Sequence, residues 1–287
     1  MKHMCSVGPF YGSKMKLAEF AESALKSGYD GIEIGLDGVK WPEEIKKEEI
    51  TAVKKAKIPV GVHLPFNYLI VDDNGKYSVI NESKGDYFIN SIKKAIKFAG
   101  DINAEYSVHH PVMQFITNRK INDEIYFDIL SIAKTLAGEV ELLCHKKNIE
   151  LCMENIVPYF DSPIEIMKEF VGLSENINVC FDIGINMLDD AELKRNSTWK
   201  DWFKTYNSRI LTVHYSDISK SNKLITHHMK IGKSDFDFES FFKEAKKSGV
   251  KYLVSEEAFS SFSLKSQKEM GWGEKKQSLA KIKEWLK

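Results

Sequence analysis

The stretch Ile149-Glu-Leu-Cys-Met-Glu154 is a short apolar run that ends on a carboxylate, and the same pattern recurs five more times along the chain. The other five runs end on His63, His110, Asp182, His214 and Glu256. Each run is typical of a short buried strand, because it is rich in Val, Ile and Leu and is bounded by turn residues. A charged or imidazole group at such a position costs free energy unless it is paired or binds something. The repetition therefore predicts one shared site.

Helical patterns separate these runs, so that strand and helix alternate eight times. Two more strands are expected near residues 4–7 and 29–34, and long loops at 64–83 and 215–235. The expected helices cover about 14–27, 42–56, 84–99, 122–146, 162–171, 190–206, 238–248 and a last segment up to 286. This order predicts an α/β fold, a closed (β/α)8 barrel built by the single domain 1–287, with its active site at the C-terminal strand ends. An open doubly wound sheet is disfavoured, because no Gly-x-Gly-x-x-Gly follows the first strand.

The composition of the chain indicates which classes of binding partner and which cellular compartment to expect. The 287 residues contain 41 basic and 41 acidic side chains, so no global basic field attracts nucleic acid or a membrane surface. The N-terminus lacks the apolar core of a signal peptide, and no segment reaches the roughly 18 apolar residues of a membrane span. The four cysteines form no C-x-x-C pair and are expected to be reduced. The sequence predicts a cytoplasmic enzyme acting on a small molecule; homo-oligomerisation stays open.

Strand alternation gives the direction of the side chains. In Cys152-Met153-Glu154 the large apolar residue is expected to face the helices, while the acid and the cysteine face the barrel interior. The same alternation holds for Cys180-Phe181-Asp182, and it turns His214 inward. Glu256 competes with Glu257, which the alternation directs outward.

Glu154, Asp182, His214 and Glu256 combine three carboxylates with one imidazole. This set suits one divalent ion, Mn²⁺, Mg²⁺, Co²⁺ or Zn²⁺, and leaves room for substrate oxygens. Without a cation, three buried acids beside a histidine would repel one another. A glutamate on each side of a bound hydroxy-ketone could remove a proton from carbon and return one. The sequence therefore predicts a metal site with Glu154 and Glu256 as the acid/base pair.

Taken in order along the strand ends, short motifs of this chain resemble the xylose-isomerase-like TIM barrel superfamily. This superfamily includes sugar and sugar phosphate isomerases and epimerases, and AP endonucleases of the endonuclease IV type. The resemblance covers nearly the whole chain. Its motifs are Gly-Tyr-Asp-Gly-Ile-Glu33, Val-His63-Leu-Pro-Phe, Val-His-His110-Pro, Met-Glu154-Asn, Cys-Phe-Asp182-Ile-Gly, Val-His214-Tyr-Ser-Asp217, His228-Met-Lys-Ile-Gly232 and Leu-Val-Ser-Glu256.

The resemblance to the epimerase branch implies a one-metal site at the same four residues and proton transfer through an enediolate by the two glutamates. Two departures alter the usual sugar contacts. Ile185 stands where many relatives carry a histidine, and Lys220 stands where ketose epimerases often carry an arginine.

Five residues are expected near the substrate: His63, His110, His228, Glu33 and Lys220. For His63 and His110, structural hydrogen bonding and metal ligation stay open as alternatives. For Glu33, the alternative is a structural ion pair.

Two other functions remain. An endonuclease IV-like zinc phosphodiesterase would use His63, His110 and His228 together with the four-residue set, but Ile185 and Thr226 replace two ligands of its third zinc. The other alternative is a barrel that binds a ligand without catalysis, and Ile185 is its main support. With no net basic charge, nucleic acid is the less expected partner.

Overall fold

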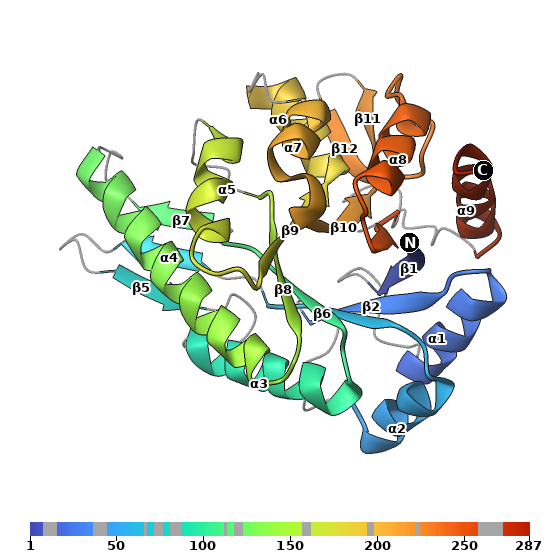
Figure 1. Cartoon of the computed structure of the whole chain (residues 1–287), viewed down its shortest axis with the longest axis horizontal. Helices are drawn as coiled ribbons and strands as arrows, with labels where there is room; N and C mark the ends of the chain where they lie inside the picture. Colours follow the sequence, from blue (N-terminus) through green and yellow to red (C-terminus); the bar gives the residue numbers. More distant parts are fainter. Residues whose placement is uncertain are drawn as a thin grey trace.

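Eight parallel strands close into a barrel in the order β1-β13-β10-β9-β8-β6-β3-β2 (Figure 1). The computed structural model describes residues 1–7, 16–36, 45–65, 68–71, 77–80, 88–111, 114–117, 123–156, 162–193, 198–221, 224–257 and 272–287. The barrel strands are β1 (Lys2–Val7), β2 (Gly31–Gly35), β3 (Val60–His63), β6 (Tyr106–His109), β8 (Glu150–Glu154), β9 (Ile177–Asp182), β10 (Ile210–Tyr215) and β13 (Tyr252–Ser255). The prediction of a closed (β/α)8 barrel is confirmed.

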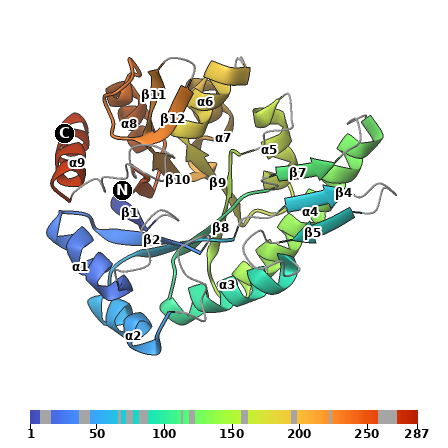
Figure 2. The same ribbon diagram turned by 180° about the vertical axis from the view of Figure 1, so that it is seen from behind.

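Helices surround the barrel strands (Figures 1 and 2). They are α1 (Leu17–Lys26), α2 (Lys47–Ala56), α3 (Phe88–Ile102), α4 (Asp123–His145), α5 (Pro163–Val171), α6 (Ile183–Leu193), α7 (Trp199–Tyr206), α8 (Phe238–Lys247) and α9 (Trp272–Trp285). The single helix expected over 190–206 is wrong: α6 begins directly after Asp182, and α7 begins after Thr198, whose hydroxyl accepts a hydrogen bond from the Asp201 amide. In the described parts of the chain, no helix is both long and apolar enough to cross a membrane.

The two long loops expected from the sequence contain strands, two within 64–83 and two within 215–235, and a further strand follows β6 outside both ranges. β4 (Tyr68–Val71), β5 (Tyr77–Ile80) and β7 (Gln114–Thr117) form a three-stranded sheet, while β11 (Asp217–Ser221) and β12 (Leu224–Met229) form an antiparallel hairpin. These strands are short; β4 pairs with the neighbouring β5 in a hairpin, and only its pairing with β7 joins segments far apart in the sequence. Because they follow the C-terminal ends of β3, β6 and β10, they lie at the end of the barrel that carries the expected site.

The expected alternation of side chains is confirmed. Cys152 and Cys180 belong to a small buried cluster that also contains Tyr106 and Tyr252, and this cluster fills the barrel interior. Met153 and Phe181 belong to the larger apolar layer between strands and helices. The acids at the ends of β8 and β9 therefore share the inward direction of the cysteines two residues before them.

Gly61 on β3 makes room for an aromatic ring inside the barrel. A Cβ atom on Gly61 would lie 2.3 Å from Cζ and 2.5 Å from the hydroxyl oxygen of Tyr106. Tyr106 is fully buried, and its ring centroid lies 4.5 Å from that of Tyr252. A larger residue at position 61 would displace this ring, since the interior is closely packed.

We expect Gly61→Ala to lower the free energy of unfolding by about 1–3 kcal/mol, because the added methyl group overpacks the barrel. Chemical denaturation measures this change. The matched control is Gly138→Ala in α4, where an added Cβ meets nothing within 4 Å. There the substitution should stabilise the helix by roughly 0.5–1 kcal/mol. Equal stability of Gly61→Ala and wild type would contradict this account of the interior.

Candidate metal centre

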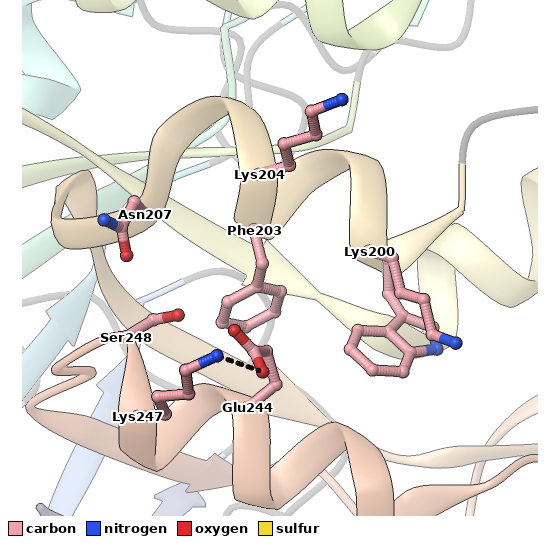
Figure 3. A pocket seen from close by; sticks show the side chains of 8 residues that line it. Lys200, Phe203, Lys204, Asn207, Glu244, Lys247 and Ser248 are labelled. Atoms are coloured by element: carbon pink, nitrogen blue, oxygen red, sulfur yellow. Dashed lines mark ion pairs between the residues drawn. The ribbon is translucent and has the colours of Figure 1, made fainter.

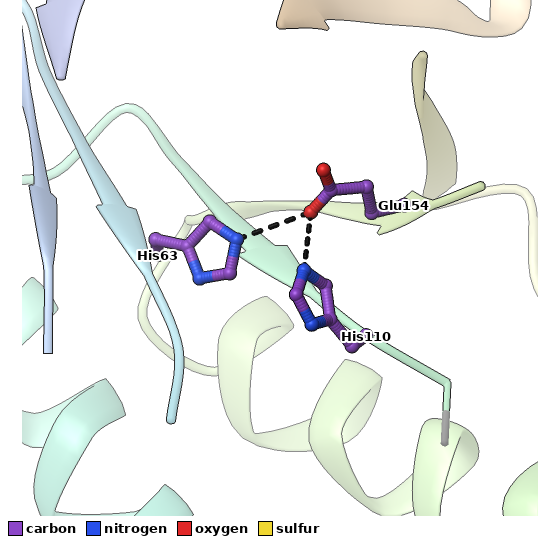
Figure 4. A group of neighbouring side chains, drawn as sticks. All are labelled: His63, His110 and Glu154. Carbon is purple, nitrogen blue, oxygen red and sulfur yellow. Dashed lines mark hydrogen bonds and ion pairs between the residues drawn. The ribbon is translucent and has the colours of Figure 1, made fainter. Parts of the chain in front are cut away.

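Glu154, at the end of β8, is the centre of the buried polar cluster. Its Oε2 lies 3.1 Å from Nε2 of His63 and 2.5 Å from Nε2 of His110 (Figure 4). Its Oε1 lies 3.3 Å from Nδ1 of His214. Only 1% of Glu154 is exposed. Three imidazoles from β3, β10 and the residue after β6 therefore converge on one carboxylate.

The four residues predicted to bind metal come together. Glu154, Asp182, His214 and Glu256 each offer one ligand atom, and these atoms all lie within 4.8 Å of one another. Oε1 of Glu256 lies 3.2 Å from Nδ1 of His214, so carboxylate oxygens flank this nitrogen from two strands. Two further groups of potential metal-ligating side chains lie equally close together, within 4.8 Å, and both contain Glu154. One adds His63 and His110, and the other adds Cys180 and His214.

The donor set fits a divalent cation. Nδ1 of His214 is buried, and no described group has hydrogen-bond geometry to it. Its other ring nitrogen, Nε2, lies 3.1 Å from Oε2 of Glu33. An imidazole nitrogen that faces carboxylate oxygens without a hydrogen-bond partner is suited to metal ligation, and oxygen with nitrogen donors suits Mn²⁺, Co²⁺ or Zn²⁺.

The pKa shifts of the clustered carboxyl groups also favour a bound cation. Burial and the neighbouring Glu256 and Glu154 raise the pKa of Asp182 well above its ordinary value. Burial and Glu154 raise the pKa of Glu256 despite the opposing charge of His214. The pKa of Glu154 is lowered well below its ordinary value, because His110 and His214 outweigh its burial. Three carboxylates thus compete for too little positive charge, which a divalent cation would supply.

Asp182 is held in place by two groups. Its backbone N–H donates to Oδ1 of Asn155 at 2.6 Å, and Nδ2 of Asn155 donates to its carbonyl at 3.0 Å. The Ile185 amide donates to Oδ1 of Asp182 at 2.8 Å, so Asp182 also caps the first turn of α6. The sequence predicts no role for Asn155. Its position directly after Glu154 is the feature of the sequence that could have indicated one.

His228 reaches the cluster from β12. Its backbone has φ 58°, and its Nδ1 lies 3.8 Å from Oε2 of Glu256. Lys220 lies on β11, but the position of its side chain is outside the part of the chain that the structure describes. Glu33 lies on β2 and is fully buried, with His214 and Tyr106 as its partners.

Two buried carboxylates anchor the segment that follows His228. Asp217 accepts hydrogen bonds from the amides of Lys233 at 2.6 Å and Ser234 at 3.0 Å. Glu257 accepts one from the Ile231 amide at 2.8 Å. Glu257, two residues after β13, is fully buried; its carboxylate accepts a hydrogen bond from the Ser255 hydroxyl and its carbonyl accepts one from Lys275 of α9, so it lies on the helix side, as the alternation predicts. The sequence does not predict this role for Asp217 or Glu257. Their partners in that segment are backbone amides, and these produce no pattern of residue types in the sequence.

A surface groove of about 500 Å³ lies elsewhere, between α7 and α8 (Figure 3). Its lining combines aromatic rings with lysines, and Lys247 pairs there with Glu244 at 3.6 Å. Glu244 is the single acid among the lining residues, so this groove lacks the clustered carboxylates of the strand ends.

The fold and the cluster define the class: a (β/α)8 barrel with carboxylates and imidazoles gathered at the C-terminal strand ends. A family model described as a xylose isomerase-like TIM barrel matches residues 21–285. The chain belongs to this family. No match to a curated protein is found.

Crystal structures of similar fold include three barrel proteins. A D-tagatose 3-epimerase-like protein is 19% identical, with TM-score 0.66, and the match covers 100% of this chain and 97% of that one. The 3-keto-D-glucoside 4-epimerase from E. coli is 14% identical, with TM-score 0.69 and 99% of both chains covered. The IolI protein with a bound zinc atom is 18% identical, with TM-score 0.65, and 100% and 98% are covered. At these identities the likeness establishes the fold alone.

The contacts of His63 and His110 with Glu154 predict that the free energy of unfolding of the metal-free protein depends on pH. Burial lowers the pKa of His63, but its hydrogen bond to Glu154 outweighs this and raises the pKa to about 9. A raised histidine pKa contributes stability that is fully present below about pH 6.5 and is lost as the pH rises through about 9. We expect the free energy of unfolding to fall over this window by an amount on the order of 2 kcal/mol.

Chemical denaturation of metal-free protein at a series of pH values measures this loss. His63→Gln should remove it, whereas His145→Gln, at an exposed position in α4, should leave the pH profile as in wild type. Identical profiles for His63→Gln and wild type would rule out the ion pair with Glu154.

Proposed function

We propose that the protein is a divalent-metal-dependent isomerase or epimerase that acts on a sugar or sugar phosphate. The observation that carries the proposal is the convergence of Glu154, Asp182, His214 and Glu256, whose ligand atoms lie within 4.8 Å of one another. Membership of the xylose isomerase-like family supports it, and so do the sugar epimerases among the proteins of similar fold.

These four residues would hold one ion, Mn²⁺, Mg²⁺, Co²⁺ or Zn²⁺. Such an ion supplies positive charge that polarises a substrate carbonyl and so acidifies the neighbouring carbon. The zinc atom bound by the IolI protein is consistent with this choice of cofactor.

Glu154 and Glu256 would transfer the proton. They come from β8 and from the end of β13, which are separated in the barrel by β9 and β10, so they approach the centre from different sides. In the metal-free protein His110 and His214 lower the pKa of Glu154, whereas burial raises the pKa of Glu256, so the two carboxyl groups differ in their affinity for a proton. Carboxyl groups whose pKa values are pushed apart in this way suit a base and an acid. Glu154 would take the proton from carbon, and Glu256 would return one to the resulting enediolate.

His63, His110 and His228 would orient the substrate oxygens around this pair. Lys220 stays a predicted substrate contact. We also infer, from the sequence alone, one domain over 1–287 and a cytoplasmic protein, with oligomeric state open.

The test is solvent exchange. Metal-loaded protein is incubated in D₂O with ketopentoses, ketohexoses and their phosphates, and deuterium at carbon is followed by NMR. We expect exchange with at least one substrate, and loss by a factor of about 10²–10⁴ in Glu154→Gln and in Glu256→Gln. Glu141→Gln is the control, because Glu141 is a buried carboxylate that bonds Ser174 and Asn176 in the outer layer. Near-normal exchange in both site variants would contradict the mechanism.

Metal content is the second test. Mass spectrometry of protein purified without chelator should find about one divalent ion per chain, and Asp182→Asn should lose it while keeping its fold by circular dichroism. Folded wild-type protein that takes up neither Mn²⁺, Co²⁺ nor Zn²⁺ would leave a non-catalytic barrel as the better description.

A specific observation favours a second candidate function, a zinc phosphodiesterase resembling endonuclease IV. His63, His110 and Glu154 form a metal-ligating group of their own beside the first. Two zinc ions per chain and nicking of abasic DNA, both lost in His110→Ala, would support this candidate. Intact abasic DNA after incubation with zinc-loaded protein would exclude it.

A further inference from the structure

Glu33 is a fully buried carboxylate beneath the metal-ligating cluster. It lies in the middle of β2 and is 0% exposed. Its Oε2 lies 3.1 Å from Nε2 of His214 and accepts a hydrogen bond from the Tyr106 hydroxyl at 2.9 Å. Both partners are themselves 0% exposed. Its Oε2 is held by these two buried groups, which points to a role through His214; the substrate contact expected from the sequence stays a prediction.

The two ring nitrogens of His214 have different surroundings. Nε2 faces Glu33, whereas Nδ1 faces Oε1 of Glu154 and Oε1 of Glu256 at 3.3 and 3.2 Å. A neutral imidazole carries its proton on one nitrogen and a lone pair on the other. If Nε2 donates its proton to Glu33, the lone pair is on Nδ1, which is the nitrogen that faces the cluster.

A short series of contacts fixes Glu33 in turn. The Tyr106 hydroxyl holds its Oε2, and the Tyr106 ring is confined by Tyr252 and by the space that Gly61 leaves. These residues belong to β2, β3, β6 and β13, so the barrel itself sets the position of the carboxylate.

We propose that Glu33 is a positioning residue of the metal centre: it fixes the tautomer and the ring orientation of His214, and Tyr106 holds Glu33 for this purpose. The inference rests on the proposed function in one respect, that His214 is a metal ligand. Carboxylates that accept from the second nitrogen of a ligating histidine raise metal affinity in proteins generally.

The experiment is a titration of metal-free protein with Co²⁺, followed by calorimetry and by visible absorption. We expect Glu33→Gln to bind Co²⁺ about 10–100-fold more weakly than wild type. Tyr106→Phe, which keeps the ring but lacks the hydroxyl, should weaken binding to a smaller degree in the same direction. Both variants should shift the Co²⁺ absorption band, a change that a loss of fold stability alone does not produce. Glu141→Gln, which lacks a buried carboxylate of the outer layer, should bind as wild type.

The outcomes separate this inference from the proposed function. Unchanged Co²⁺ affinity and absorption in a folded Glu33→Gln variant overturn the inference and leave the proposed function standing. Wild-type protein that binds none of Co²⁺, Mn²⁺, Mg²⁺ and Zn²⁺ overturns both. If Glu33→Gln does not fold, Tyr106→Phe decides: wild-type affinity and spectrum in that variant overturn the positioning role, and weakened binding with a shifted spectrum supports it.

Discussion

The mutual repulsion of three carboxylates buried around one imidazole is the constraint on which the rest of the site depends. Glu154, Asp182 and Glu256 meet at His214 within 4.8 Å, shielded from most of the solvent that would screen them. In such surroundings each carboxylate needs a donor or a cation. The contacts around them follow from that need: His63 and His110 on Glu154, and the Ile185 amide on Asp182.

The supports of the cluster come from several layers of the barrel. Glu33 contacts His214 from inside the barrel and is itself held by the Tyr106 hydroxyl, whereas Asn155, directly after β8, fixes the backbone of Asp182. Outside the barrel, Asp217 and Glu257 bind backbone amides of the segment after His228. Carboxylates thus lie both in the cluster and in the outer layer, and strand alternation separates them: Glu256 lies beside His214, whereas the carboxylate of Glu257 accepts from the Ile231 amide and its carbonyl from Lys275 of α9.

The barrel strands and the four-residue cluster could be predicted from the sequence because both depend on local pattern. Alternation with period two assigns Glu154 and Asp182 to the interior, and parallel strands bring their ends to one rim. The sequence did not predict β4, β5, β7, β11 and β12: β4 with β5, and β11 with β12, form local hairpins inside segments expected to be loops, and β7 pairs with β4, more than 40 residues earlier in the chain. For Glu33 the sequence left a substrate contact and a structural ion pair open, and it could not name the ion-pair partner because Tyr106 and His214 lie on β6 and β10.

Glu154 is where the two candidate functions compete. A carboxylate that takes a proton from carbon needs an oxygen open to the substrate, yet Oε2 already meets His63 and His110, and Oε1 faces His214. If Oε1 serves a metal, proton transfer needs Oε2, and at least one of the two imidazoles has to yield its place to the carbon acid. If His63, His110 and Oε2 held a second ion instead, this oxygen would be engaged and would not be available as a base. The two proposals therefore differ in what they require of the group that contacts Oε2 beside His63 and His110.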